Sequence, residues 1–169
     1  MFQLVARRRS MVGVTLSLLL CCAVILGSLM VASPVAKASD QSDKLARELY
    51  QKYGGSGIWL VTKEDSAETI KKLKKEGKPY RVLPLSSHLD QTTALSKAIN
   101  KILNSSDLTP SMINGYRPSF SFWCSKSDQP YWQIKFDLTS KDTILPVITV
   151  RVSATDGSIM YYNSTDSDG

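Results

Sequence analysis

Residues 119–162 contain several short segments in which apolar and polar side chains alternate, and only short turns separate them. The clearest of these segments places Trp132, Ile134, Phe136 and Leu138 on one side of the chain. Alternation with a period of two over eight residues is typical of a strand buried on one face. Consecutive strands joined by short turns must run antiparallel. The sequence therefore predicts an antiparallel β-meander.

Three further segments complete the predicted meander. Their apolar positions are Phe120, Phe122 and Cys124, then Ile148, Val150 and Val152, and last Ile159 to Tyr162. Turns are expected at residues 127–130 and 139–142, and a tight hairpin is expected at Thr155-Asp156-Gly157. Gly157 can adopt the positive φ that such a hairpin needs.

A helix is expected just before the meander, over residues 90–104. Its apolar residues recur at helical spacing on one face, at Leu95, Ala98, Ile99, Ile102 and Leu103. Such a face has to be buried, and the apolar side of the sheet is available for it. The expected fold class is α+β, a helix packed on an antiparallel β-meander whose other face is wet. Residues 104–118 are expected to form a polar connection.

Residues 39–89 predict an N-terminal helix-strand-helix-strand extension. The first helix covers residues 40–53 and ends at Gly54-Gly55, and a strand follows at 58–61. Asp65 is expected to cap a second helix that ends near Gly77, before a strand at 80–83. The order strand, helix, strand is compatible with a small parallel unit.

The first 38 residues have the layout of a signal peptide. Three arginines, Arg7 to Arg9, precede an apolar run from Met11 to Ala32, and Ala36-Lys37-Ala38 offers a cleavage site. The alternative is an uncleaved membrane anchor, because roughly 20 apolar residues suffice to span a bilayer. The predicted domains are thus a targeting segment (1–38), an α/β extension (39–89), an α+β unit (90–163) and a flexible tail (164–169).

Removal of this segment changes the charge of the chain. The full sequence has 21 basic and 15 acidic residues, a net charge of +6, but residues 1–38 hold four basic residues and no acidic ones. The remainder has 17 basic and 15 acidic residues, a net charge of +2, and predicts no nucleic-acid partner. It also keeps one cysteine, Cys124, so it forms no internal disulfide. An exported chain of this kind fits a bacterial envelope or an extracellular setting.

The helix and meander of residues 90–162 resemble the PepSY domain family. The resemblance rests on the strand Trp132-Gln133-Ile134-Lys135-Phe136 and on the hairpin of residues 150–159, with its alternating valines and Asp156-Gly157. It implies a cystatin-like α+β fold of exported bacterial proteins and of metallopeptidase propeptides. It also implies a role in restraining peptidases or in binding within the envelope, and it supplies no catalytic residue.

Residues that could carry chemistry are few. After residue 38 the chain has one histidine, His88, and one cysteine, so a metal site built from several such residues is excluded. No cofactor is expected. A nucleophilic pair of Cys124 and His88 stays open, although Cys124 shares the face of Phe120 and Phe122 that is predicted to be buried.

Aromatic side chains are the candidate partner-binding residues. Trp123 and Tyr131 fall on the polar side of their strands, and Tyr116 and Tyr161 lie near strand ends. Exposed aromatic residues favour contact with a protein partner. In the alternative interpretation, a second layer built from residues 39–89 covers that face and makes them part of the core.

Three functions follow from these observations. The leading interpretation is a non-catalytic, exported binding module that restrains a peptidase or binds another envelope protein. The second is a secreted enzyme that uses Cys124 and His88. The third is a structural envelope component, which touches the membrane only through an uncleaved N-terminal segment.

Overall fold

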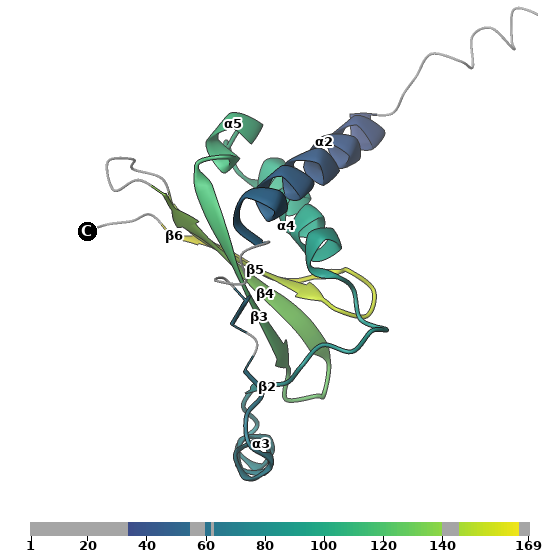
Figure 1. Ribbon diagram of the computed structural model, residues 1–169, viewed down its shortest axis with the longest axis vertical. Helices are drawn as coiled ribbons and strands as arrows, with labels where there is room; N and C mark the ends of the chain where they lie inside the picture. Colours follow the sequence, from purple (N-terminus) through teal and green to yellow (C-terminus); the bar gives the residue numbers. More distant parts are fainter. Residues whose placement is uncertain (1–33, 55–59, 62, 140–145, 166–169) are drawn as a thin grey trace, which may run out of the picture. The chain divides into compact units, whose positions relative to one another are not determined.

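The computed structural model describes residues 34–54, 60–61, 63–139 and 146–165 (Figure 1). The chain divides into two compact units, residues 1–37 and 38–169, and the sheet and the helices, apart from the first residues of the first described helix, belong to the second. The predicted targeting segment lies outside the described residues, apart from its last few residues, which begin helix α2 (Pro34–Leu49). Within the part of the chain that the structure describes, no helix is both long and apolar enough to cross a membrane.

Four strands form the predicted antiparallel meander. They are β3 (Tyr116–Cys124), β4 (Pro130–Leu138), β5 (Val147–Ser153) and β6 (Ile159–Thr165), and each pairs antiparallel with the next. Gly157 has a φ of 73°, as the predicted hairpin requires. Strand β6 continues to Thr165, so the tail predicted from residue 164 begins inside the last strand, and residues 166–169 lie outside the described residues.

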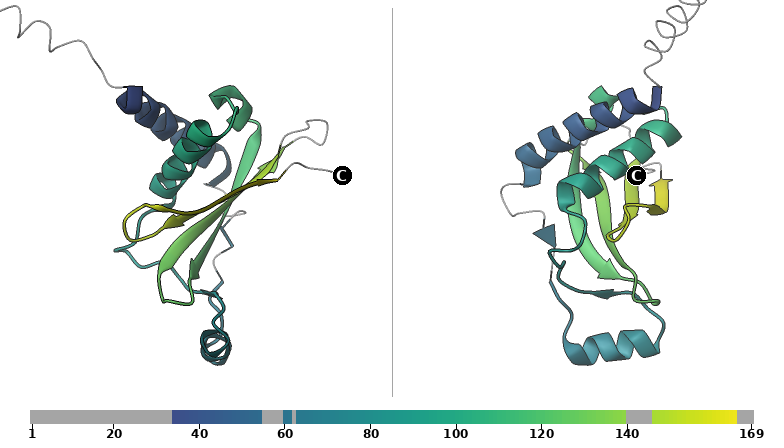
Figure 2. Two further views of the ribbon diagram at one scale, coloured as in Figure 1. Left: turned by 180° about the vertical axis from the view of Figure 1, so that it is seen from behind. Right: turned by 90° about the vertical axis from the view of Figure 1, so that its right-hand side faces the viewer.

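Helix α4 (Gln91–Ser105) packs on the apolar face of the sheet, as predicted (Figures 1 and 2). Asp90 caps it, because its carboxylate accepts a 2.9 Å hydrogen bond from the Thr93 backbone N–H. The buried face of the helix consists of Ala94, Leu95, Ala98, Ile99 and Ile102, each fully inaccessible. Burial of one of the leucine or isoleucine side chains stabilises the fold by about 1.5–3 kcal/mol. The α+β class is therefore confirmed.

Helix α2 lies beside α4 on the same face of the sheet (Figure 2). Leu45, Ala46 and Leu49 are buried in the same core cluster, which confirms the apolar face predicted for this segment. The helix continues as a π-helical turn, η1 (Tyr50–Gly54), next to strand β3. A Cβ atom at Gly54 would lie 2.7 Å from the Tyr50 ring, so glycine is needed where the chain turns past that ring.

The two short strands of the N-terminal extension do not form the predicted parallel unit. Strands β1 (Leu60–Val61) and β2 (Tyr80–Arg81) both pair with β3, along its edge away from β4. β1 runs parallel to β3, with Leu60 opposite Phe120, and β2 runs antiparallel, with Arg81 opposite Trp123. The parallel-unit interpretation is wrong because β3 offers both strands a longer partner than they offer each other. Ile58 and Trp59 lie outside the described residues.

Helix α3 (Ala67–Lys75) is capped by Ser66, which corrects the prediction of an Asp65 cap. The Ser66 hydroxyl accepts a 3.3 Å hydrogen bond from the Thr69 backbone N–H. Asp65 is engaged elsewhere, because its carboxylate accepts hydrogen bonds from the Arg81 backbone N–H (2.7 Å) and guanidinium (2.9 Å). These bonds to the backbone and the charged side chain of Arg81 occupy the Asp65 carboxylate, which leaves the cap to Ser66. The predicted end of the helix at Gly77 is confirmed, with a φ of 64°.

The connection between α4 and the sheet is shorter than predicted. It contains a short helix, α5 (Pro110–Ile113), and strand β3 already begins at Tyr116. Pro118 therefore lies inside a strand, opposite Phe136 of β4. Proline has no backbone N–H to donate, so it is tolerated in a strand only where no neighbouring strand needs that donor. Among the described residues, β1 and β2 pair with β3 only from Phe120 onward, beyond Pro118.

Candidate functional site

The sheet face opposite α4 carries two rows of polar and aromatic side chains, here called the outer face. Alternation along each strand places them there, because the residues between them point into the core. One row runs across four strands as Arg81, Trp123, Tyr131 and Ser153. The neighbouring row consists of Ser121, Gln133, Arg151 and Tyr161. Helices α2 and α4 lie on the opposite side of the sheet (Figure 2).

Arg151 is the central residue of the outer face. Its guanidinium carbon lies 5.5 Å from the centre of the Tyr131 ring and 4.8 Å from the centre of the Tyr161 ring. Its Nε donates a 3.0 Å hydrogen bond to the amide oxygen of Gln133. Each cation–π contact contributes about 0.5–1 kcal/mol where water reaches it. Two rings and an amide thus hold the charge of Arg151 in one place.

A second arginine stacks on the outer face at Trp123. The Arg81 guanidinium lies 5.9 Å from the Trp123 ring centre, and the indole N–H donates a 2.9 Å hydrogen bond to the Ser121 hydroxyl. Asp65 fixes Arg81 from the side. Burial of the Asp65 carboxylate alone favours its neutral form, but hydrogen bonds from the Arg81 backbone and side chain outweigh this and hold the pKa of Asp65 below its ordinary value.

The predicted partner-binding aromatics differ in accessibility. Tyr161 is 42% exposed and Trp123 is half-buried, so both can be reached from outside. Tyr131 is only 3% exposed, and this burial raises the pKa of its hydroxyl even though the charge of Arg151 lowers it. The alternative interpretation expects residues 39–89 to form a second layer over these aromatics. Helix α2 does not form such a layer, because it packs on the other face of the sheet. Tyr131 is instead buried among its neighbours on the sheet.

Tyr116 lies in the core and not on the surface. It is fully buried, its ring meets Phe136 edge to face, and its hydroxyl donates a 2.8 Å hydrogen bond to the Pro146 carbonyl. Burial raises the pKa of Tyr116 to about 12, and the nearby Tyr162 adds to the shift. The predicted partner-binding role of Tyr116 is therefore wrong. Strand β3 begins two residues before Pro118, so Tyr116 is part of the strand and lies on its helix-facing side.

Cys124 and His88 have different neighbours. Cys124 is partly buried beside Tyr80, and burial raises the pKa of its thiol, whereas a nucleophilic cysteine needs a lowered one. His88 stacks on Phe122, with 5.1 Å between ring centres, and its Nδ1 accepts a 3.0 Å hydrogen bond from the Leu85 backbone N–H. This arrangement gives no support to a nucleophilic pair. In the described residues, no three His, Cys, Asp or Glu side chains gather as a metal site would need.

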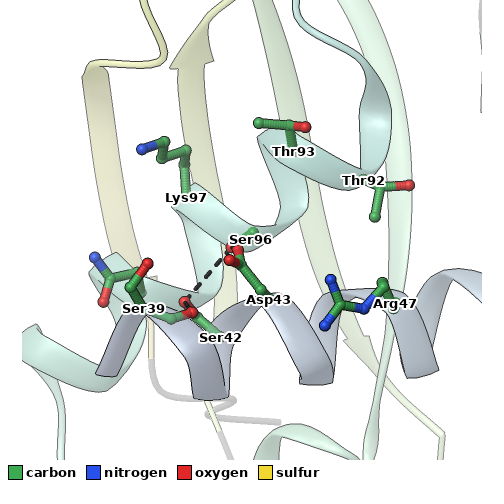
Figure 3. A pocket seen from close by; sticks show the side chains of 9 residues that line it. Ser39, Ser42, Asp43, Arg47, Thr92, Thr93, Ser96 and Lys97 are labelled. Atoms are coloured by element: carbon green, nitrogen blue, oxygen red, sulfur yellow. Dashed lines mark hydrogen bonds between the residues drawn. The ribbon is translucent and has the colours of Figure 1, made fainter. Parts of the chain in front are cut away.

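A polar cleft of about 370 Å³ lies between α2 and α4 (Figure 3). Ser42, Asp43 and Ser96 point toward one another in it, and Ser96 donates a hydrogen bond to the Asp43 carboxylate. Ser42 and Ser96 are both buried, and the Ser42 hydroxyl donates a 2.9 Å hydrogen bond to the Ser39 carbonyl. These hydrogen bonds satisfy polar groups that are buried where α2 meets α4. The polar residues of the cleft therefore help to hold the two helices together.

The two arginines are the outer-face residues that sequence reasoning missed. Arg151 lies between Val150 and Val152, and its place in the alternating pattern already put it on the side away from the core. Arg81 could not be placed, because nothing in the sequence said which strand residues 80–81 join. In comparisons with protein-family models, with curated proteins and with solved structures, no match to this chain is found.

Proposed function

We propose that this protein is a non-catalytic, exported binding module of PepSY-like, cystatin-like type, and that it holds a protein partner on the outer face of its sheet. The observation that carries the proposal is the placement of Arg151 between the rings of Tyr131 and Tyr161. Arginine and aromatic side chains are enriched at the energetic centres of protein interfaces. Fixing them before binding reduces the entropy that association costs.

The charge of the outer face specifies the chemistry of the partner. Four basic residues point to this side, Arg81, Arg117, Lys135 and Arg151, against two acidic ones, Asp65 and Asp137. Asp65 is committed to Arg81, and Asp137 lies opposite Arg117 in the pairing of β3 with β4. A partner that presents carboxylates would complement the remaining positive charge, and the planar guanidinium of Arg151 suits a carboxylate well.

A peptidase of the envelope or medium is the partner class that the PepSY resemblance favours. In that case the module restrains the peptidase by occupying its surface, and the module needs no reacting group of its own. Helix α4 packed on the meander supports this proposal, since it is the arrangement that the resemblance implies. The Cys124 and His88 neighbourhoods described above do not favour an enzyme.

For the test, the protein is expressed from the complete gene in a secretory host, and the form that this host produces is used. Immobilised protein is exposed to envelope and culture-supernatant proteins, and each captured protein is purified and titrated against the module by calorimetry. If the captured protein is a peptidase, its activity is followed during the titration. The proposal expects saturable binding that weakens with salt, because carboxylates pair with the arginines.

Variants of Arg151 make the test specific. Arg151→Met keeps the length of the side chain and removes its charge, and it is expected to weaken binding at least tenfold. Arg151→Lys keeps the charge and loses the planar fork, so an intermediate loss is expected. Lys126→Met, in the exposed β3–β4 turn, removes a charge away from the outer face and serves as the control. Equal binding by all four proteins would refute the outer face as the binding surface.

A further inference from the structure

Strand β6 forms one end of the sheet and pairs with β5 on one side only. The strand order is β1, β3, β4, β5, β6, with β2 also on β3, so among the described strands no partner lies on the far side of β6. The opposite end of the sheet is different, because β1 and β2 cover part of the edge of β3. That side of β6 therefore presents backbone N–H and C=O groups that no described strand pairs with, and these groups can pair with another strand.

The residues of β6 lack two protections usual for exposed edges. Natural sheets guard an edge strand with lysine or other charges, or with proline, and Ile159–Thr165 contains neither. Its side chains are accessible, since Tyr161 is 42% exposed and Asn163, Ser164 and Thr165 are exposed as well. One protection is present, a β-bulge near Met160, where the register to β5 shifts. The regular stretch beyond it, residues 161–165, stays in register with β5.

We infer that two copies of this protein associate by antiparallel pairing of their β6 strands, which joins the two sheets into one. A second copy is the occupant that the strand fits. Two-fold pairing sets each strand against its own sequence, and a charged edge would then repel itself, whereas this stretch carries no charge. The inference does not depend on the proposed outer-face function, since it rests on the backbone edge of β6.

The register of this contact follows from the regular stretch. Residues 161–165 are centred on Asn163, so a two-fold axis there sets Asn163 opposite its own copy. Tyr161 then meets Thr165 of the other copy, and Tyr162 meets Ser164. Five residues in register at about 3.4 Å each make a short contact, and the dimer is expected to form in a concentration-dependent way.

Charges placed on the axis test this register. In Asn163→Lys two ammonium groups would face each other across the strands, and in Asn163→Asp two carboxylates would do so. Each variant alone is expected to dimerise about fivefold more weakly than the unaltered protein. An equimolar mixture of the two sets a lysine opposite an aspartate and is expected to recover the dimer. Molecular mass is measured by sedimentation over a range of protein concentrations, on protein produced from the complete gene.

Two controls keep the experiment decisive. Ser105→Lys adds the same charge at the exposed end of α4 and is expected to dimerise like the unaltered protein. Far-ultraviolet circular dichroism checks that every variant is folded. An unaltered protein that stays monomeric at all concentrations would overturn the inference. Dimerisation of Asn163→Lys alone as strong as that of the unaltered protein would also overturn it. The dimer is measured on the protein alone, with no other protein present, so failure here is distinct from failure of the proposed function.

Discussion

The Tyr80 hydroxyl donates a 2.5 Å hydrogen bond to the carboxylate of Asp128, which joins strand β2 to the turn between β3 and β4. Lys74 of helix α3 pairs with the same carboxylate at 3.1 Å. Asp128 itself has a φ of 56°, a left-handed conformation that Asp tolerates better than most residues. One turn residue thus holds two segments that lie far from it in sequence.

Removal of the Tyr80 hydroxyl should loosen this junction. Tyr80 is 4% exposed, so Tyr80→Phe keeps the packing and loses one hydrogen bond, at an expected cost of about 1 kcal/mol in the free energy of unfolding by urea. Hydrogen exchange at the Arg81 amide should accelerate more than exchange in β4. Tyr161→Phe, at an exposed ring on β6, is a comparison for the loss of a hydroxyl from the surface. Unchanged exchange at Arg81 would contradict the role given to this bond.

The stability of the fold should depend on pH through the hairpin that follows β5. Hydrogen bonds from Ser153 and from the backbone and side chain of Ser158 lower the pKa of Asp156 to about 2, from an ordinary value of 3.8. A carboxyl whose pKa is lowered by folding stabilises the fold fully above its unfolded-state pKa, and this contribution is lost as the pH falls toward 2. Thermal melting between pH 5 and pH 2 measures the loss.

Asp156→Asn should reduce the part of this acid sensitivity that comes from the hairpin. The melting temperatures of the variant and the unaltered protein are expected to converge as the pH falls from 4 to 2. Asp107→Asn changes an exposed carboxylate in the α4–α5 connection and is the matched control. A constant difference between Asp156→Asn and the unaltered protein over this range would show that Asp156 is not the titrating group.

Helices α4 and α3 should respond very differently to truncation. Ile99 of α4 is fully buried, so Ile99→Ala leaves a cavity and is expected to cost about 2–5 kcal/mol in the free energy of unfolding. No residue of α3 is buried, and Leu73→Ala should cost much less. Urea denaturation of both variants tests this. Equal losses would mean that α3 contributes more to the core than its exposure indicates.

Cys124 should react slowly with thiol reagents in the folded protein. Burial raises the pKa of its thiol, so little thiolate is present at neutral pH, and labelling should accelerate on unfolding in urea. His88→Ala should leave the folded-state rate unchanged. Fast labelling of Cys124 that His88→Ala slows would instead support the enzyme interpretation.

The meander and helix α4 could be predicted from the sequence because their signals are local. Apolar and polar residues alternate without a break from Trp132 to Leu138, and the buried residues of α4 recur at helical spacing. The buried face of each element can therefore be identified from its own residues. Gly157 marked its hairpin in the same way. These elements needed no knowledge of distant parts of the chain.

The N-terminal extension could not be placed in the same way. Strands β1 and β2 have two residues each, too few for a pattern, and their partner β3 lies about 40 to 60 positions later in the chain. The role of Asp65 depends on the position of Arg81, which is determined by the tertiary structure. The accessibility of Tyr131 likewise depended on Arg151, which lies over its ring from the neighbouring strand β5.

The placement of β1 and β2 on a single edge has a consequence for how the chain assembles. Strands β3 to β6 each pair with the next strand in the chain, so these pairings close short loops and are expected to form early. Leu60 meets Phe120 only after a loop of about 60 residues has closed, at a greater cost in chain entropy. We therefore expect the folding nucleus to lie in the strands β3 to β6, and the edge of β3 to be covered late.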